Sequence, residues 1–149
     1  IRIIEEIAPR FSSQDVHFFI IGKGVPKCKS NNTSSLGYVE DLYSTLNAMD
    51  IAVVPLTSGT ATKLKMFDYM SVGLPIISTK KGSEGIKMSD GHDVIITDAD
   101  PESFEQSIYR VLTDPSLQNT LAENGRQLIE QRYNWDTIGD KFRSVIQCL

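Results

Sequence analysis

One stretch decides the fold of this chain: IAVVPLTSGTATKLKMFDYMSVGLP, residues 51–75. Its first six residues form a short apolar run of the kind that is buried on both faces of a parallel sheet. The small residues 57–60 then let backbone N–H groups approach an anion where the next helix starts. The stretch therefore predicts a strand, a loop suited to a diphosphate, and a helix.

Three charged side chains accompany the start of this helix. Lys63 and Lys65 lie where a cation can neutralise phosphate oxygens that the helix dipole already attracts. Asp68 follows, and its carboxylate can accept two hydrogen bonds from a vicinal diol such as a ribose. The alternative is an ordinary core helix anchored by Leu64 and Phe67, with Lys65 and Asp68 as a surface ion pair. The chemistry of these residues alone leaves both interpretations open.

Strand patterns alternate with helical patterns almost throughout the chain, which indicates β–α units around a parallel sheet. The predicted strands are Val16–Ile21, Ser34–Tyr38, Ile51–Pro55, Pro75–Thr79 and Asp93–Thr97. The predicted helices are Ile1–Phe11, Glu40–Met49, Thr62–Val72, Pro101–Thr113, Pro115–Arg132 and Trp135–Cys148. Asp100 and Asp114 each precede a proline and are predicted N-caps. We expect an α/β, Rossmann-like fold whose parallel sheet has helices on both faces, with extra C-terminal helices.

Length and composition limit the possible partners. The 149 residues, 40% of them hydrophobic, are enough for one compact domain, residues 1–149. The net charge is −4 without a basic stripe, so nucleic acid is not an expected partner. No apolar run approaches the ~20 residues of a transmembrane segment. Cys28 and Cys148 are far apart in the sequence, and we interpret them as reduced thiols of a cytoplasmic protein.

The chain opens inside an amphipathic helical pattern, at Ile1 rather than at a methionine. A helix without a preceding strand lacks the first half of a β–α unit. We therefore expect a fragment of a longer protein, from which the first strand is absent.

The residues of the deciding stretch also resemble a known family. The resemblance rests on Gly59, Thr60, Lys63, Lys65, Asp68, Met70, Gly73 and Pro75. These residues resemble the donor-binding segment of GT-B glycosyltransferases of the GT4 (group 1) family. The resemblance implies a C-terminal domain that binds a nucleotide-diphosphate sugar, facing an acceptor domain that is absent here. It further implies sugar transfer with retention and without a metal or other cofactor. The absent domain could bring such a protein to a membrane surface.

The chain departs from the family pattern at two positions. The family often has two glutamates separated by seven residues, whereas this chain has Thr60 and Asp68. An aspartate still accepts a diol, although with a shorter reach. A threonine cannot act as an anion toward the sugar, so the role of the first glutamate is not transferred to Thr60.

Further donor contacts are expected from loops that follow the strands, because ligands of open parallel sheets bind outside the carboxyl ends. Gly22 and Gly24 would let a phosphate or sugar approach, or simply form a turn. Tyr38 would pack beside the base, or serve as a core or rim tyrosine. Glu84 would accept a sugar or ribose hydroxyl, or remain a solvated loop acid.

The full set of predicted donor-binding residues combines these loops with the deciding stretch. The set is Gly22, Gly24, Tyr38, Gly59, Thr60, Thr62, Lys63, Asp68 and Glu84. No catalytic residue is assigned within the chain. The Asp98-Ala99-Asp100 sequence resembles a metal-binding Asp-x-Asp, but Asp100 is explained as a helix cap, and no metal is predicted.

Two other hypotheses remain. A sugar-nucleotide epimerase of the same general fold would need histidine and carboxylate groups that the pattern does not place. A non-catalytic α/β module that binds a partner protein would need none of the donor-binding residues.

Overall fold

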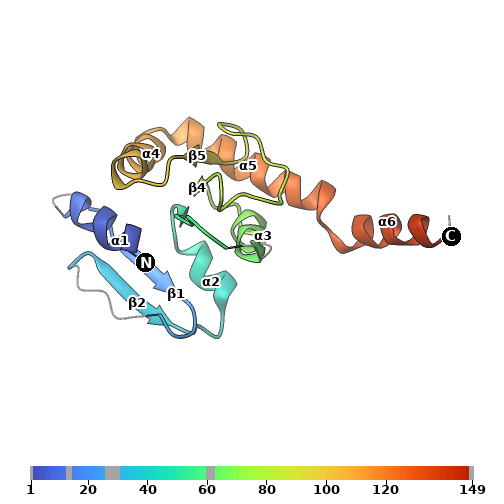
Figure 1. Cartoon of the computed structure of the whole chain (residues 1–149), viewed down its shortest axis with the longest axis horizontal. Coiled ribbons are helices and arrows are strands. Elements are labelled where there is room, and N and C mark those ends of the chain that lie inside the picture. The colour runs from blue at the N-terminus through green and yellow to red at the C-terminus, as the bar shows by residue number, and fades with distance from the viewer. Residues whose placement is uncertain (1, 13–14, 26–30, 60–62, 148–149) are drawn as a thin grey trace.

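The structure is a computed structural model that describes residues 2–12, 15–25, 31–59 and 63–147. Helices and strands alternate along most of the chain, as Figure 1 shows. The described strands are β1 (Phe18–Ile21), β2 (Thr33–Gly37), β3 (Ala52–Val54), β4 (Ile76–Thr79) and β5 (Ile95–Thr97). The described α-helices are α1 (Arg2–Ile7), α2 (Leu42–Asn47), α3 (Leu64–Ser71), α4 (Pro101–Thr113), α5 (Pro115–Arg132) and α6 (Trp135–Gln147). The expected α/β class is confirmed.

The described strands form two parallel sheets rather than the single sheet that we expected. β1 pairs with β2, and β3, β4 and β5 pair in that order. Ala52 lies opposite Ile76, and Ile77 lies opposite Ile95. Within the described ranges no hydrogen-bond ladder joins the β1–β2 sheet to the β3–β4–β5 sheet. All three described strand pairs are parallel, which requires a crossover connection between the two strands of each pair.

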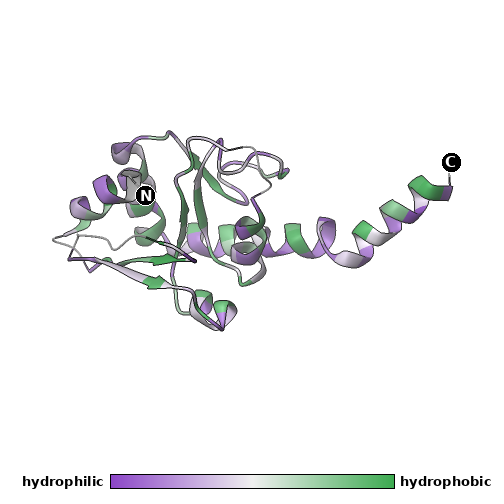
Figure 2. Cartoon of the chain, turned by 60° about the horizontal axis from the view of Figure 1, so that its bottom comes forward, coloured by the Kyte–Doolittle hydropathy of each residue, from purple (hydrophilic) through white to green (hydrophobic). Residues whose placement is uncertain are grey.

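Helices cover both faces of the β3–β4–β5 sheet, as predicted. Ile76 and Ile77 are neighbours in β4 and point to opposite faces, because side chains alternate along a strand. Ile76 packs in a buried cluster with Met66 and Met70 of α3. Ile77 packs in a second buried cluster with Phe104 of α4 and with residues that follow α1. Figure 2 shows that the central strands are largely hydrophobic, whereas the helices combine hydrophobic and hydrophilic residues.

The helix boundaries follow local chemistry. Asp100 Oδ1 accepts a hydrogen bond from Ser103 N at 2.9 Å, and Asp114 Oδ1 accepts one from Leu117 N at 3.0 Å. Both predicted caps are thus confirmed, and α4 and α5 begin at the predicted prolines. The first helix is shorter than predicted. It changes to a 3₁₀ turn over Ala8–Phe11, where Pro9 lacks the N–H that an α-helix would use.

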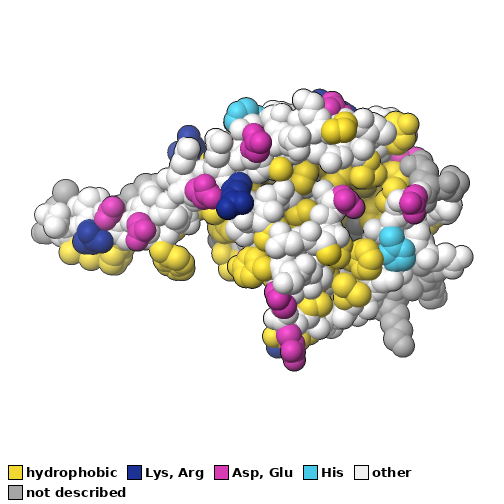
Figure 3. All heavy atoms as spheres, turned by 180° about the vertical axis from the view of Figure 1, so that it is seen from behind, with side chains coloured by type: hydrophobic (Ala, Val, Ile, Leu, Met, Phe, Trp, Pro, Cys, Tyr) yellow, Lys and Arg dark blue, Asp and Glu magenta, His cyan; other side chains and the backbone are white. Residues whose placement is uncertain are grey.

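The C-terminal helix α6 extends away from the rest of the molecule (Figure 1). Several of its large hydrophobic side chains are exposed: Trp135, Ile138, Phe142, Val145 and Ile146. Figure 3 shows hydrophobic side chains gathered along one side of this extension. Among the described helices, none is both long and apolar enough to cross a membrane.

Candidate donor-binding site

Lys63 occupies the N-cap position of α3, directly after the loop that follows β3. Its backbone oxygen accepts a hydrogen bond from Met66 N at 2.8 Å. The lysine is only 6% exposed, which is unusual for an ammonium group. A Cβ atom built on Gly59 would lie 3.8 Å from Lys63 Nζ, so the ammonium group lies against the loop backbone. Gly59 has a φ of +112°, a conformation that favours glycine.

Lys65 adds a second positive charge to the first turn of α3. Desolvation holds the pKa of Lys65 below its ordinary value, and the charge of Lys63 lowers this pKa further. Both causes disfavour the charged form of Lys65. A bound anion would offset both effects, because its negative charge attracts the ammonium groups of both lysines.

The loop after β4 lies within the electrostatic reach of Lys63. Lys81 Nζ lies 2.5 Å from Glu84 Oε2, and the side chains form an ion pair. The hydrogen bond from Lys81 holds the pKa of Glu84 below its ordinary value, followed by the charge of Lys81 and, to a smaller extent, that of Lys63. Glu84 and Lys63 are thus close enough for the charge of Lys63 to act on the pKa of Glu84, while a donor contact of either residue stays a prediction.

Gly82 sets the position of this loop. A Cβ atom at Gly82 would collide with Ser78 Oγ and would lie 2.9 Å from the carbonyl oxygen of Val54. The loop can therefore contact the ends of β3 and β4 only because residue 82 has no side chain. Gly82 N also donates a hydrogen bond to Thr79 Oγ1 at 2.9 Å.

Asp68 lies on α3 with its side chain turned toward α2. The hydroxyl group of Tyr43 donates a hydrogen bond to Asp68 Oδ1 at 3.3 Å. Within the described part of the chain, Asp68 makes this contact and no ion pair with Lys65, so the predicted alternative surface pair is absent. The alternative interpretation also named Leu64 as a residue that anchors the helix in the core, which is wrong. Leu64 is exposed at the helix start, whereas Met66 and Met70 are fully buried.

The loops that follow β1 and β2 lie side by side. Gly22 N donates to the carbonyl oxygen of Gly37 at 2.8 Å. Gly22 and Gly24 have positive φ angles of 143° and 70°. Lys23 Nζ lies 5.1 Å from the ring centroid of Tyr38, and the ring is 66% exposed. Tyr38 is thus a surface tyrosine with the Lys23 ammonium group over its ring, and stacking of a base on it stays a prediction.

The predicted site residues fall into three local groups. Gly59, Lys63 and Glu84 share one neighbourhood, Gly22 and Gly24 lie beside Tyr38, and Asp68 is joined to α2. Thr60 and Thr62 lie outside the described residues. Sequence reasoning missed Tyr43, because 25 positions separate it from Asp68 and no motif links them. It also missed the ion pair between Lys81 and Glu84, although a separation of three residues between opposite charges could have suggested this pair.

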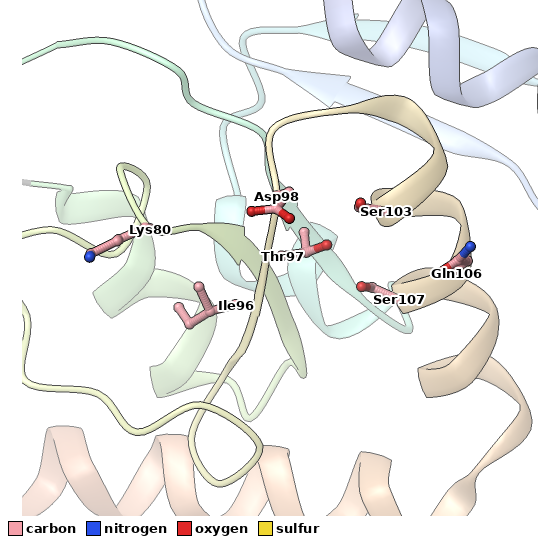
Figure 4. A pocket seen from close by; sticks show the side chains of 7 residues that line it. All are labelled: Lys80, Ile96, Thr97, Asp98, Ser103, Gln106 and Ser107. Atoms are coloured by element: carbon pink, nitrogen blue, oxygen red, sulfur yellow. The ribbon is translucent and has the colours of Figure 1, made fainter.

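A separate polar hollow of about 330 Å³ lies beyond the ends of β4 and β5 (Figure 4). The side chains around it come from the end of β4, from β5 and its following loop, and from one side of α4. None of the predicted donor-binding residues lines it. Asp98 borders this hollow, while Asp100 caps α4 as expected. Among the described residues, no group of histidine, cysteine, aspartate and glutamate could hold a metal ion.

Comparison with known proteins assigns the chain to a family. The sequence model of the family described as Glycosyl transferases group 1 matches residues 1–114. The chain is 22% identical over 126 residues to the GDP-mannose-dependent monoacylated alpha-(1-6)-phosphatidylinositol monomannoside mannosyltransferase of Corynebacterium glutamicum. The match covers 79% of this chain and 33% of that protein. The lipopolysaccharide core biosynthesis glycosyltransferase LpsE of Rhizobium meliloti is 24% identical, with 74% and 32% covered. The chain thus spans about a third of the length of these curated relatives.

Solved structures share the fold. The structure of Anabaena Alr3699/HepE in complex with UDP superposes with a TM-score of 0.81 at 16% identity. The superposition covers 97% of this chain and 44% of that one. A glycosyltransferase of Rickettsia africae gives a TM-score of 0.82 at 12% identity, with 97% and 42% covered. These identities establish the fold alone, and the family model supplies the relationship: the chain belongs to the group 1 family of glycosyl transferases.

Proposed function

We propose that this chain is the donor-binding domain of a glycosyltransferase that transfers a sugar from a nucleotide-diphosphate sugar to an acceptor. The observation that carries the proposal is the buried ammonium group of Lys63 against the Gly59 loop, at the start of α3. Ligands of open α/β sheets bind outside the carboxyl ends of strands, and this loop follows β3. A buried cation at a helix start suits a diphosphate.

The proposed chemistry concerns the leaving group. As the bond between the sugar and the diphosphate breaks, negative charge grows on the diphosphate oxygens. Lys63, Lys65 and the backbone amides at the start of α3 would stabilise this charge without a metal ion. Thr60 and Thr62 stay predicted contacts of the same loop.

The other predicted residues would orient the donor. The Asp68 carboxylate would accept hydrogen bonds from the ribose diol, and Glu84 would accept one from a sugar hydroxyl. Tyr38 would stack beside the base, and Gly22 and Gly24 would leave room for close backbone approach.

The acceptor and part of the catalytic machinery would come from a domain outside this chain. We therefore expect the 149 residues alone to bind a donor but not to transfer its sugar. The family resemblance implies retention of the anomeric configuration, which an NMR analysis of the product of the complete enzyme would test. Sugar transfer by the isolated chain would contradict the proposal that a second domain supplies the acceptor site and part of the catalytic machinery.

A titration of the chain with nucleoside diphosphates tests the proposal. UDP and GDP are the first ligands to measure, because the Anabaena structure holds UDP and the Corynebacterium relative is GDP-mannose-dependent. We expect Lys63→Met to weaken binding about tenfold or more, since a charged hydrogen-bond donor is lost. Arg110→Met is the matched control, because it removes one exposed positive charge from α4. Equal affinity of the two variants, or no nucleotide binding at all, would contradict the proposal.

Removal of divalent metal ions with a chelator tests separately whether nucleotide binding is independent of a metal. We expect the same nucleotide affinity with EDTA as without it, because the two lysines supply the positive charge. Loss of binding in EDTA, restored by a divalent cation, would replace this mechanism with a metal-assisted one.

A further inference from the structure

The hydrogen bond from Tyr43 to Asp68 joins two helices at a place where no motif predicted a contact. Tyr43 lies in the first turn of α2, and Asp68 lies in α3. The donor and acceptor atoms are 3.3 Å apart. Since α2 follows β2 and α3 follows β3, this contact ties the connection after β2 to the connection after β3.

The first turn of α2 is itself fixed by several hydrogen bonds. Asp41 caps the helix and accepts from Ser44 N at 2.9 Å and from Ser44 Oγ at 2.6 Å. Asn47 Nδ2 donates to the backbone oxygen of Tyr43 at 3.0 Å. The hydrogen bond to Ser44 also holds the pKa of Asp41 below its ordinary value, so this cap stays ionised down to low pH. The phenol ring of Tyr43 therefore projects from a well-defined turn.

The carboxylate of Asp68 keeps capacity for a ligand. An ionised carboxylate offers about four acceptor positions on two oxygens, and Tyr43 takes one of them on Oδ1. The side chain of Asp68 is half-buried, which limits the directions from which other groups can reach it. A hydroxyl donor on one side restricts the orientation of the carboxylate and leaves the remaining acceptor positions for other hydroxyl groups.

We propose that Tyr43 is a positioning residue that holds the Asp68 carboxylate in the orientation that accepts the ribose diol of the donor. This inference rests on the proposed function, because it assumes that Asp68 meets the ribose. It adds a consequence: selectivity for ribonucleotides over deoxyribonucleotides depends on a residue that need not touch the ligand. A short aspartate side chain gains most from such a partner, since it cannot adjust its reach.

Tyr43→Phe removes only the hydroxyl group and keeps the ring. The affinity of the 149-residue chain is measured for UDP and GDP and for their 2′-deoxy counterparts. We expect Tyr43→Phe to weaken ribonucleotide binding about three- to tenfold, the effect of one hydrogen bond. We expect little change for the 2′-deoxy nucleotides, because they lack one of the hydroxyl groups that the oriented carboxylate accepts.

Tyr109→Phe provides a matched control. It makes the same chemical change at a tyrosine of similar exposure, 55% against 54% for Tyr43, on α4. We expect this variant to bind all four nucleotides like the parent chain. Circular dichroism and thermal unfolding verify that both variants are folded.

The possible outcomes separate this inference from the proposed function. Equal losses for ribo- and deoxyribonucleotides in Tyr43→Phe would show a merely structural role and overturn the inference. Unchanged ribonucleotide affinity in Tyr43→Phe, together with weak binding in Lys63→Met, would overturn the inference alone. No nucleotide binding by the parent chain would overturn both.

Discussion

The Nζ atom of Lys81 lies 2.5 Å from Oε2 of Glu84 in the loop that follows β4. The carboxylate that we expect to meet the donor is therefore already engaged with a cation of its own loop. Since the hydrogen bond from Lys81 is the main reason for the lowered pKa of Glu84, the ion pair also favours the charged form of this side chain at acidic pH.

Removal of the lysine should change the titration of Glu84. We expect the pKa of Glu84 to rise toward its ordinary value in Lys81→Met, because the hydrogen bond and the charge that favour the carboxylate are lost. The carboxyl ¹³C shift of Glu84, followed by NMR from pH 2 to pH 7, measures this change. In the parent chain the ion pair is present above the ordinary glutamate pKa and is lost as pH falls through the lowered one. An identical Glu84 titration in both proteins would show that the pair does not persist in solution.

Lys65 should make nucleotide binding sensitive to alkaline pH. Desolvation and the charge of Lys63 lower the pKa of Lys65. As pH rises, Lys65 therefore loses its proton before the pH reaches the ordinary lysine pKa of about 10.4. We expect UDP affinity to fall as pH rises toward the ordinary lysine pKa. In that alkaline range, UDP binding should be accompanied by proton uptake, because the diphosphate favours the charged form of Lys65. Isothermal titration calorimetry in buffers of different ionisation enthalpy measures the uptake.

The matched variant for this prediction is Lys65→Arg, which keeps its charge because the guanidinium group has a pKa above 12. Both proteins bind the same nucleotide, so ionisation of the base cancels in the comparison. We expect the alkaline fall to be smaller in the arginine variant. Identical pH profiles would remove Lys65 from the binding site.

Gly82→Ala should destabilise the fold. The added Cβ would meet Ser78 Oγ and the carbonyl oxygen of Val54, and one of these contacts is backbone that cannot move freely. We expect a loss of about 1–3 kcal/mol in the free energy of unfolding, as for other overpacked interiors. Urea denaturation measures this value.

Gly139→Ala on α6 is the control for that substitution. No atom lies within 4 Å of a Cβ built at Gly139. We expect this variant to be neutral or to gain up to about 1 kcal/mol, because alanine favours a helix over glycine. A Gly82→Ala variant as stable as Gly139→Ala would show that the β4 loop can move away from β3.

A chain that ends after Asn134 should keep the fold of the rest. The large side chains of α6 are mostly exposed, and Trp135 is 87% exposed, so little packing is lost with the helix. We expect the free energy of unfolding to change by less than about 1 kcal/mol, because exposed side chains contribute little to stability. Self-association should decrease, since an exposed hydrophobic strip is removed.

A full-length chain with Phe142→Ser and Val145→Ser separates the two effects of that truncation. It keeps α6 but removes part of its apolar strip, so analytical ultracentrifugation should show the same decrease in self-association. A truncated chain that fails to unfold cooperatively would mean that α6 stabilises the domain in solution.

The sequence predicted those features that depend on neighbours along the chain. Asp100 and Asp114 were identified as caps because a side-chain acceptor followed by proline acts within a few residues. The order of strands and helices followed from periodicity. The lysines of α3 were found because they lie close to a loop of small residues, and the family resemblance supported the same positions.

Features that depend on folding in three dimensions were not predictable in the same way. The Tyr43–Asp68 hydrogen bond joins positions 25 residues apart, and neither residue alone indicates a partner. Leu64 was a wrong anchor: it is exposed at the start of the helix, while Met66 and Met70 pack in the buried cluster with Ile76 of β4. The division into two sheets follows from the pairing of whole strands, which apolar patterns do not specify.

The separation of the strands into two sheets affects how this chain behaves on its own. In the described part of the structure, β1 and β3 each have a hydrogen-bonded neighbour on one side only. Open edges of this kind are templates on which another polypeptide can add a strand. Concentrated solutions of the chain should therefore be prone to intermolecular β-pairing, and an extended peptide inserted at this seam would suppress aggregation and increase protection from hydrogen exchange.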